Sequence, residues 1–425
     1  MKVMVVGSGG REHALCWALS RSFMVERLYA APGNPGIGRL ASTVPIPADD
    51  LRGLVGFVER ESIDLTVVGP EAPLVAGLAD ELEIRGLRVF GPSREAARIE
   101  GSKAWARTLC EKHGVPSPRS SEFDEVAPAL DFVAELQPPY VIKADGLAAG
   151  KGVTIAEDRA TAERALRDCL VDRVFGDAGR RVLVEEYVEG FEVSAMALVD
   201  GRTVKPLAFA HDYKRAFDGD RGPNTGGMGS FSPVPPVDAA TETEIRETIL
   251  ERTAAALDAE GIRYRGVLYA GLMITPDGPK VLEFNCRFGD PETQVVMPRL
   301  QSNLGEALLA CVEGNLGDYE LKWTSEACVG VVLASAGYPG TVQAGVPISG
   351  LEEASRFDGV QLFHAGTAAQ DGRVLTAGGR VLTVTALGED HGDARQRAYQ
   401  ACSRVRFDGM HYRRDIGDLM GQEAR

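Results

Sequence analysis

Glu283-Phe284-Asn285-Cys286-Arg287 ends an apolar run that begins at Lys280. Alternate side chains of an extended strand share one face, so we expect Glu283, Asn285 and Arg287 to point the same way. A carboxylate and a carboxamide offer the hard oxygen ligands that Mg²⁺ prefers, and a planar guanidinium suits a phosphate anion. The stretch therefore predicts one side of a site for Mg²⁺ and a polyphosphate such as ATP.

Two lysines upstream are candidates for the other side of that site. Lys143 ends an expected strand, Tyr140–Lys143, and Lys151 lies in a glycine-rich loop, Asp145–Gly152. The loop is one residue too short for the P-loop pattern, lacks the hydroxyl after its lysine, and leads into an expected strand rather than a helix. A glycine hairpin lid over nucleotide phosphates fits better, with both lysines facing the phosphates. Taken alone, two solvated lysines beside a turn explain the segment better still.

Composition and charge restrict the class of partner. The chain has 425 residues with ordinary hydrophobic (44%) and charged (25%) fractions, which suggests a globular protein of two to four domains. Its net charge of −15 argues against nucleic acid as the main partner, because phosphate backbones favour clustered Lys and Arg. The seven cysteines form no CxxC pair, which argues against a zinc site or a disulfide framework. No apolar run is long enough for a signal peptide core or a membrane span, so we expect a cytoplasmic protein without a membrane partner.

The first hundred residues alternate short apolar runs with helical segments, and each run ends in a turn that contains Gly or Pro. The runs are Lys2–Val6, Arg27–Ala30, Leu65–Val68 and Arg88–Phe90. This alternation is typical of βαβ units and predicts an α/β domain with a parallel, Rossmann-like sheet over residues 1–101. We expect an α+β region over 102–327 and a small β-rich domain over 328–425.

The α+β region contains a predicted hairpin and a long connection. The hairpin joins strands Gly266–Ile274 and Lys280–Asn285 through a turn rich in Pro and Gly. Residues 206–236 are predicted to be a Gly- and Pro-rich connection without regular structure, which is uncommon unless such a loop binds something or is disordered. Its basic pair, Lys214-Arg215, and its glycines suit a second, anionic substrate.

The first glycine loop, residues 7–12, does not fit a dinucleotide site. Glu12 stands where the third glycine of that pattern would let the helix pack against the strand. No acidic residue ends the second strand, where a ribose hydroxyl would need one. What remains is a glycine turn at a helix N-terminus, which could seat a phosphate or be a plain tight turn.

The segment Glu185–Glu192 follows another expected strand and has the groups that a nucleoside needs. A strand-end backbone offers a donor and an acceptor to adenine, and the Glu192 carboxylate could accept both ribose hydroxyls or simply be exposed. The carboxylates of Asp290 and Glu292 could bond sugar hydroxyls or an amine. We find no GxSxG elbow and no Cys/His nucleophile motif, so covalent catalysis by the protein is not indicated.

Together these segments resemble the ATP-grasp superfamily and, within it, the glycinamide ribonucleotide synthetase family of purine biosynthesis. The resemblance covers nearly the whole chain. The runs that carry it are Gly7–Ala14, Gly69–Leu74, Lys143–Val153, Gly222–Gly229 and Glu283–Thr293. It implies an ATP-grasp fold over 102–327, with a mobile lid subdomain at about 122–187, between the Rossmann-like and the β-rich domains.

The resemblance also implies roles for individual residues. Those that would bind the phosphates, adenine and ribose of ATP are Lys103, Lys143, Lys151, Glu185, Glu186, Tyr187, Val188 and Glu192. Those that would line the glycine and phosphoribosylamine sites are Gly9, Gly10, Asn34, Glu71, Asp212, Lys214, Pro223, Asn224, Thr225, Gly226, Gly227, Met228, Arg287, Asp290, Pro291 and Glu292. Lys151, Lys214 and Arg287 would be the catalytic cations, and Glu283 with Asn285 would hold Mg²⁺ or Mn²⁺. The preceding strand, Val267–Ile274, carries no carboxylate, which leaves the rest of the metal shell open.

The implied activity is an ATP-dependent ligation of glycine to 5-phosphoribosylamine through glycyl phosphate, by an enzyme that we expect to be a monomer. One alternative is another ATP-grasp ligase or carboxylase that acts on a related purine intermediate. A nucleotide-binding regulator without catalysis is a second alternative, but it would not need the complete set of Lys143, Lys151, Glu283, Asn285 and Arg287. A nicotinamide oxidoreductase is disfavoured by Glu12.

Overall fold

The N-terminal part is a parallel sheet with both faces covered, as the alternating pattern predicted. The structure, a computed structural model, describes residues 1–146 and 152–419. Val3 and Val5 pack on the side of the first helix, while Met4 and Val6 pack on the other side. The strands, in the spatial order β3-β2-β1-β4-β5, are β1 (Lys2–Gly7), β2 (Arg27–Pro32), β3 (Ser42–Thr43), β4 (Leu65–Val68) and β5 (Val89–Phe90). The helices are α1 (Gly10–Ser20), α2 (Leu51–Glu61), α3 (Glu71–Ala76), α4 (Leu78–Glu83) and α5 (Arg98–Gly101).

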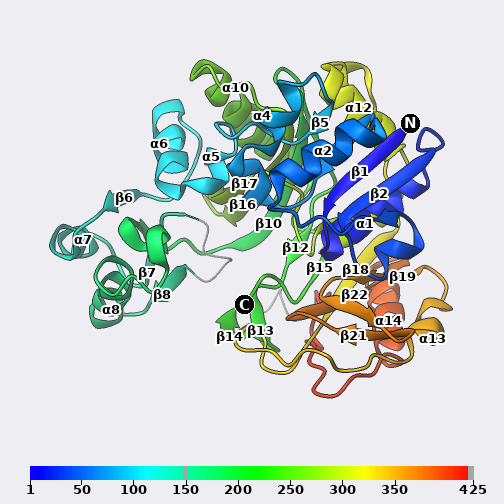
Figure 1. The fold of residues 1–425 in the computed structure, drawn as a ribbon. Helices are drawn as coiled ribbons and strands as arrows, with labels where there is room; N and C mark the ends of the chain where they lie inside the picture. Colours follow the sequence, from blue (N-terminus) through cyan, green and yellow to red (C-terminus); the bar gives the residue numbers. More distant parts are fainter. Residues whose placement is uncertain (147–151, 420–425) are drawn as a thin grey trace.

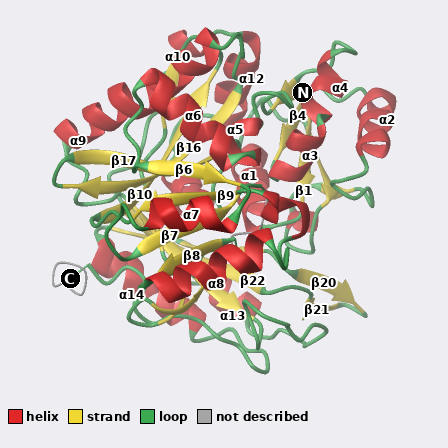
Figure 2. Cartoon of the chain, turned by 90° about the vertical axis from the view of Figure 1, so that its left-hand side faces the viewer, coloured by secondary structure: helices red, strands yellow, loops and turns green. Residues whose placement is uncertain are grey.

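A small antiparallel sheet with its own core projects from the rest of the molecule (Figure 1). Its strands, in the order β6-β9-β7-β8, are β6 (Ser120–Phe123), β7 (Tyr140–Ala144), β8 (Val153–Ala156) and β9 (Val182–Glu186). Two helices, α7 (Val126–Val133) and α8 (Arg159–Leu170), cover one face of this sheet, and Figure 2 shows them in front of it. We call this unit the lid subdomain. The expected lid lysine, Lys151, lies outside the described residues.

The predicted hairpin lies at one edge of a second antiparallel sheet, which we call the central sheet. The order is β11-β10-β16-β17, with β10 (Phe191–Val199), β11 (Val204–Pro206), β16 (Gly266–Thr275) and β17 (Gly278–Asn285). Three helical elements contact β17, namely α5, α6 (Lys103–His113) and the segment predicted over 239–260. That segment consists of α9 (Ala239–Glu244), a π-helical stretch (Ile245–Glu251) and α10 (Arg252–Ala259).

The third large sheet crosses the boundary expected at residue 327. Its order is β12-β15-β18-β22-β19, with β12 (His211–Asp212), β15 (Gly229–Ser232), β18 (Ala327–Ala334), β19 (Val360–His364) and β22 (Arg380–Gly388). The prediction of an irregular connection over 206–236 was wrong, because β12 and β15 lie in this sheet and a hairpin, β13 (Arg215–Phe217) and β14 (Arg221–Asn224), lies between them. Ser230 pairs with Gly330, and all four residues of β15 are buried. Tertiary pairing thus makes a strand of a Gly-Ser-Phe-Ser segment whose residues favour turns.

The remaining elements are four helices and a hairpin that forms a two-stranded sheet of its own. They are the helices α11 (Thr293–Val296), α12 (Leu304–Glu313), α13 (Leu351–Ser355) and α14 (His391–Cys402), with the hairpin β20 (Thr367–Gln370) and β21 (Arg373–Thr376). Single 3₁₀ turns lie at Ile37–Arg39, Gly176–Arg180, Met297–Arg299 and Leu316–Asp318. Residues of the N-terminal, central and C-terminal parts share two hydrophobic clusters, and all seven cysteines are free thiols buried in one of the three cores. Among the described residues, no helix has the length and apolar character that crossing a bilayer requires.

Glu12 closes the first glycine loop from below. Its side chain is 2% exposed, and its Oε2 accepts a hydrogen bond of 2.6 Å from the Gly9 backbone N–H. Any Cβ added at Gly7 or Gly69 would overlap the Glu12 side chain. Glu12, whose presence argued against a dinucleotide site, therefore fills the space beneath the loop. Glycine is needed at positions 7 and 69, at two strand ends, to leave room for its side chain.

We predict opposite effects for two glycine-to-alanine changes in the N-terminal part. The variant Gly69→Ala should lose about 1–3 kcal/mol of stability, because its methyl group would displace the buried Glu12 carboxyl. The matched change Gly56→Ala lies inside α2, where nothing approaches within 4 Å, and should gain roughly 0.5–1 kcal/mol from helix propensity. Thermal and urea unfolding of both variants would measure this, and equal stabilities would contradict the packing described here.

Candidate functional site

Glu185 lies at the seam between the lid subdomain and the central sheet, held by two cations. Lys143 Nζ is 2.6 Å from Glu185 Oε2, and Arg107 Nε donates to Oε1 at 2.5 Å. Both cations also donate to the backbone oxygen of Leu282 on β17, each at 2.8 Å. Glu185 is 1% exposed, so neither of its side-chain oxygens faces solvent, and any contact with adenine would come from the backbone.

Burial and charge act in opposite directions on this cluster. Burial by itself would raise the pKa of Glu185, but Lys143 and Arg107 outweigh it and hold that pKa below its ordinary value. For Lys143, burial is the larger influence and lowers the pKa despite the adjacent Glu185. Lys103 lies near the same strand end, because its Nζ donates to the backbone oxygens of Ala144 at 3.2 Å and Gly146 at 2.8 Å. Two of the expected phosphate ligands thus converge at the end of β7.

A second cation lies between two carboxylates in the segment that follows the lid. Lys214 forms ion pairs with Glu192, the expected ribose ligand, and with Asp212 at 3.2 Å. Burial lowers the pKa of Lys214, but Asp212 and Glu192 together raise it well above its usual value, so the amine stays charged. Glu283 is half-buried and follows Leu282 on β17, so it lies next to the residue whose backbone oxygen accepts a hydrogen bond from Lys143.

Arg287 is surrounded by carboxylates and a carboxamide. Its guanidinium lies 3.3 Å from Glu71 and 3.1 Å from Glu100, and it donates to Asn285 Oδ1 at 2.9 Å. Burial favours a higher pKa for Glu71, yet Arg287 and Arg11 bring that pKa below its usual value. The expected alignment of Asn285 with Arg287 is therefore present, but the guanidinium contacts protein oxygens rather than being free for an anion.

Glu283 and Asn285 were expected to hold a divalent metal ion. Both offer hard oxygen donors, and among residues 1–146 and 152–419 no group of three or more His, Cys, Asp or Glu could hold a metal ion on its own. Mg²⁺ is ordinarily bound by one or two protein carboxylates together with substrate phosphates and water. This donor set therefore fits a Mg²⁺ ion that arrives with a nucleotide.

Glu292 is the most deeply buried carboxylate on the substrate side. It is 3% exposed, and its Oε1 accepts hydrogen bonds from Ser194 Oγ at 2.9 Å and Tyr269 Oη at 2.8 Å. Burial raises the pKa of Glu292, and the neighbouring Asp212 raises it further. The glutamate therefore holds its proton to a higher pH than an exposed one.

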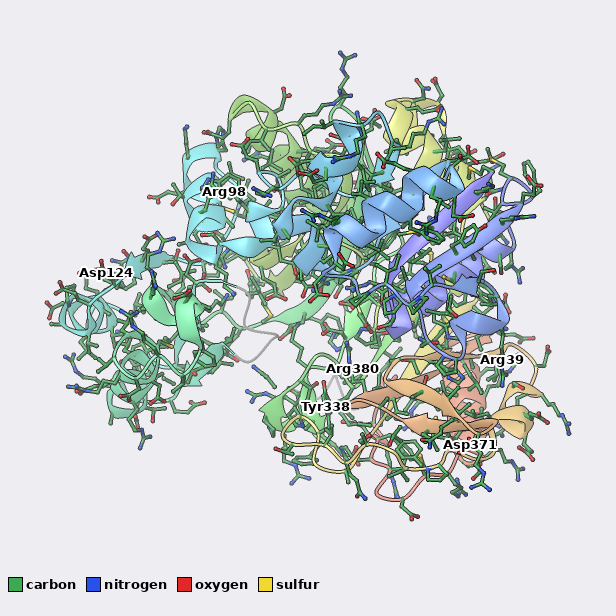
Figure 3. The ribbon with its side chains drawn as sticks, in the orientation of Figure 1. Arg39, Arg98, Asp124, Tyr338, Asp371 and Arg380 are labelled. Carbon is green, nitrogen blue, oxygen red and sulfur yellow. The ribbon has the colours of Figure 1, made fainter. Side chains whose placement is uncertain are left out.

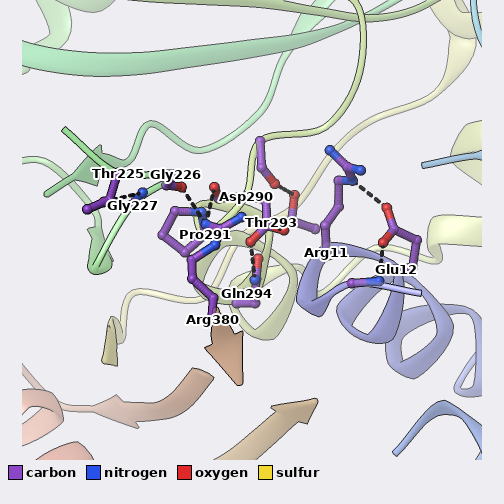
Figure 4. Close-up of polar contacts among 12 residues, drawn as sticks. Arg11, Glu12, Thr225, Gly226, Gly227, Asp290, Pro291, Thr293, Gln294 and Arg380 are labelled. Atoms are coloured by element: carbon purple, nitrogen blue, oxygen red, sulfur yellow. Dashed lines mark hydrogen bonds and ion pairs between the residues drawn. The ribbon is translucent and has the colours of Figure 1, made fainter. Parts of the chain in front are cut away.

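Most of the expected glycine and phosphoribosylamine residues not yet described lie in three neighbouring segments. Gly9 and Gly10 at the start of α1, the loop over residues 223–228 and the Asp290-Pro291 turn lie around one another. Figure 4 shows Arg380 in contact with both the loop and the turn. Asn34 is placed differently, because its amide is used within the protein. It donates to the backbone oxygens of Ser8 and His364, each at 2.8 Å, and accepts from two backbone N–H groups of its own turn.

Several residues of the site were not predicted from the sequence. Arg107 lies one helical turn after Lys103, so helical periodicity could have placed both on one face of α6. Glu100, Tyr269 and Arg380 gave no such signal, because their partners are distant in sequence: Glu100 bonds the Cys286 N–H, and Arg380 pairs with Asp290.

Family models match the chain in three consecutive parts. The N domain of phosphoribosylglycinamide synthetase matches residues 1–100, its ATP-grasp (A) domain residues 101–293, and its C domain residues 328–419. The chain belongs to the phosphoribosylglycinamide synthetase family. The family expected from the sequence is thereby confirmed, and with it an ATP-grasp ligase of mixed α/β architecture.

Individual relatives of this family match over their full length. The phosphoribosylamine–glycine ligase of Allochromatium vinosum is 50% identical over 420 residues, which is 98% of each chain. That of Caldanaerobacter subterraneus subsp. tengcongensis is 49% identical over 416 residues, or 98% of this chain and 99% of the other. The crystal structure of the Thermotoga maritima phosphoribosylamine–glycine ligase superposes with a TM-score of 0.85 at 36% identity, covering 98% of this chain and all of that one.

More distant structures share the fold alone. A biotin carboxylase domain of the Hydrogenobacter thermophilus 2-oxoglutarate carboxylase, in a complex with MgADP, superposes with a TM-score of 0.75 at 16% identity, over 97% of this chain and 91% of that one.

The raised pKa of Glu292 leads to a pH-dependent prediction. The unfolded chain releases this proton near the ordinary Glu pKa of about 4.3, so the stability that Glu292 contributes is full below that pH and is lost as the pH rises through the higher folded-state pKa. The variant Glu292→Gln cannot ionise and keeps an oxygen for Ser194 and Tyr269. Relative to the parent, its stability should therefore increase as the pH rises from 5 to 8.

Urea unfolding at both pH values would measure this difference. The matched change Glu352→Gln, at an exposed position of α13, should show no such trend. A Glu292→Gln difference that is constant across this pH range would mean that Glu292 is ionised like a surface glutamate.

Proposed function

We propose that this chain carries out the phosphoribosylamine–glycine ligase reaction for which its relatives are named, a step of purine biosynthesis. In this reaction ATP, glycine and 5-phosphoribosylamine give glycinamide ribonucleotide, ADP and phosphate. The observation that carries the proposal is the placement of two cations on one sheet, in a chain that matches the family along its length. Lys143 contacts β17 at Leu282, next to Glu283, and Lys214 pairs with Glu192 on β10.

The proposed chemistry has two steps. A carboxylate oxygen of glycine attacks the γ-phosphorus of ATP and ADP leaves, which gives glycyl phosphate. The amine of phosphoribosylamine then attacks the acyl carbon, phosphate leaves with its electron pair, and the nitrogen loses a proton as the amide forms. Phosphoryl transfer of this kind depends on positioning and on neutralising the charge of the transferred group.

The residues of this chain are suited to those two needs. Lys143 and Lys103 would bind phosphate oxygens, and Lys214, kept charged by its two carboxylate neighbours, would neutralise charge near the acyl phosphate. Glu283 and Asn285 would hold Mg²⁺, which when bound offsets the charge of the phosphate oxygens. The loop over 223–228 with Asp290 and Glu292 would line the glycine and phosphoribosylamine sites. The ATP roles of Lys151 and of the backbone at Glu186, Tyr187 and Val188 stay predictions, as do a monomeric state and a cytoplasmic location.

The product test is direct. The purified chain is given ATP, Mg²⁺, glycine and freshly generated phosphoribosylamine, and the product is identified by mass spectrometry. Glycinamide ribonucleotide, with ADP release that needs both substrates, supports the proposal. ADP release that depends on bicarbonate or formate in place of glycine would assign the chain to another ATP-grasp reaction, and ATP binding without any release would indicate a regulator.

We predict that Glu283→Gln lowers kcat about 100-fold or more and raises the Mg²⁺ concentration needed for half-maximal rate, because it removes the charged metal ligand. Initial rates across a Mg²⁺ titration measure both effects. Circular dichroism and thermal unfolding should match the parent, since the Glu283 carboxylate is half-buried and lies at the end of a formed strand. An unchanged Mg²⁺ dependence would remove Glu283 from the metal site.

A further inference from the structure

Two side chains of the C-terminal part hold the backbone of a single residue, Gly226, in the loop that follows β14. The Gly226 N–H donates to Tyr338 Oη at 2.9 Å, and the Gly226 carbonyl accepts a hydrogen bond from Arg380 Nη1. Figure 3 labels both side chains where the C-terminal part meets the middle of the molecule. Both polar groups of this backbone position thus have a partner from a segment more than 100 residues away in sequence.

The same guanidinium also holds the turn that follows β17. Arg380 Nη1 donates to the Asp290 backbone oxygen at 2.8 Å, and Nη2 lies 3.2 Å from the Asp290 carboxylate (Figure 4). The other oxygen of that carboxylate accepts from Gln294 Nε2 at 2.7 Å. Burial alone would raise the pKa of Asp290, but Arg380 and then Arg11 bring it below the usual range, so the aspartate is ionised opposite the guanidinium.

Close packing fixes these contacts. Gly227 has a φ of +106°, and a Cβ there would overlap the Pro291 ring. A Cβ at Gly379, the residue before Arg380, would overlap the Tyr338 ring, so the aromatic side chain lies directly on the backbone that carries the arginine. The two loops therefore meet through glycine and proline, with Arg380 bridging them at three acceptors.

We propose that Arg380, with Tyr338, is a positioning residue that sets the loop over residues 225–228 in register with the Asp290-Pro291 turn, and through them the glycine and phosphoribosylamine sites. This inference rests on the proposed function, in which both loops line those sites. The planar guanidinium bonds one carboxylate and two carbonyl oxygens at once, and it does so without needing to touch a substrate. The C-terminal part would therefore contribute to the reaction by holding the two loops in place.

The test compares four variants of the full chain. Arg380→Met removes the bridge and keeps the bulk of the side chain, Arg380→Lys keeps the charge but not the planar fork, and Tyr338→Phe removes one acceptor. Arg373→Met, at an exposed position of β21, is the matched control. For each variant, kcat and the KM of ATP, glycine and phosphoribosylamine are measured, together with the Kd for a non-hydrolysable ATP analogue and the midpoint of thermal unfolding.

We expect Arg380→Met to lower kcat/KM for glycine and for phosphoribosylamine about 100-fold, because small displacements of positioning groups have effects of that size. The Kd for the ATP analogue should stay within about twofold of the parent value, because Arg380 makes no contact with the Lys143 cluster. Arg380→Lys should recover part of the loss and Tyr338→Phe should lose several-fold, while Arg373→Met behaves as the parent. Hydrogen exchange at the Gly226 and Gly227 amides should be faster in Arg380→Met.

Three results would overturn the inference. The first is an Arg380→Met variant that equals the parent in rate and amide exchange. The second is a rate loss accompanied by an equal loss of ATP affinity and thermal stability, which is the pattern of a purely structural residue. The third is an Arg380→Met variant that has lost catalytic rate but whose Gly226 and Gly227 amides exchange as slowly as in the parent, which would contradict loop positioning. If Arg380→Met does not fold, Arg380→Lys and Tyr338→Phe decide the question by the same criteria. If the parent chain makes no glycinamide ribonucleotide, the proposed function is refuted instead. Amide exchange at Gly226 and Gly227 in Arg380→Met would still show whether Arg380 fixes the loop.

Discussion

The buried carboxylate of Glu185 joins the three elements on which the nucleotide side of the site depends. It contacts Arg107 on α6 and Lys143 on β7, and both cations continue to the backbone oxygen of Leu282 on β17. Removing one partner of such a buried pair typically destabilises a protein by about 3–5 kcal/mol, because a charge is left without compensation. The lid subdomain has its own core, and polar contacts tie its strands β7 and β9 to the central sheet, with this cluster and the Lys280–Glu186 ion pair among them.

Other cations of the proposed site are likewise paired with carboxylates of the protein. Lys143 has Glu185, Lys214 has Asp212 and Glu192, and Arg287 has Glu71 and Glu100 as partners. Each cation is therefore held in a defined place by oxygen atoms of the protein. Preorganised charges of this kind stabilise a developing negative charge without reorientation at the moment of reaction, which is what phosphoryl transfer from a nucleotide requires.

The C-terminal part is built into this arrangement and is not an independent appendage. Two strands from residues 211–232 complete its sheet, and its core residues belong to the same clusters as those of the N-terminal sheet. Arg380 begins the long strand β22 and reaches the two loops on the substrate side. A rigid strand end is a suitable base for a positioning group, because the backbone of a central strand is held on both edges.

The sequence by itself determined the parallel N-terminal sheet, the central hairpin and the family. Short apolar runs at a fixed rhythm, a Pro-Asp-Gly turn and the long run from Glu283 to Thr293 are local signals that need no partner to be recognised. Only the tertiary structure decided that β15 is a strand, that the Asn34 side chain bonds the backbone of its own turn, and that Arg287 and Arg380 pair with carboxylates. The physical reason is that a strand of poor propensity is stabilised by its neighbours, and a charge by whichever opposite charge the fold brings near. Arg107 and Glu185, or Arg380 and Asp290, are separated by 78 and 90 residues along the chain, so nothing local to either residue specifies its partner.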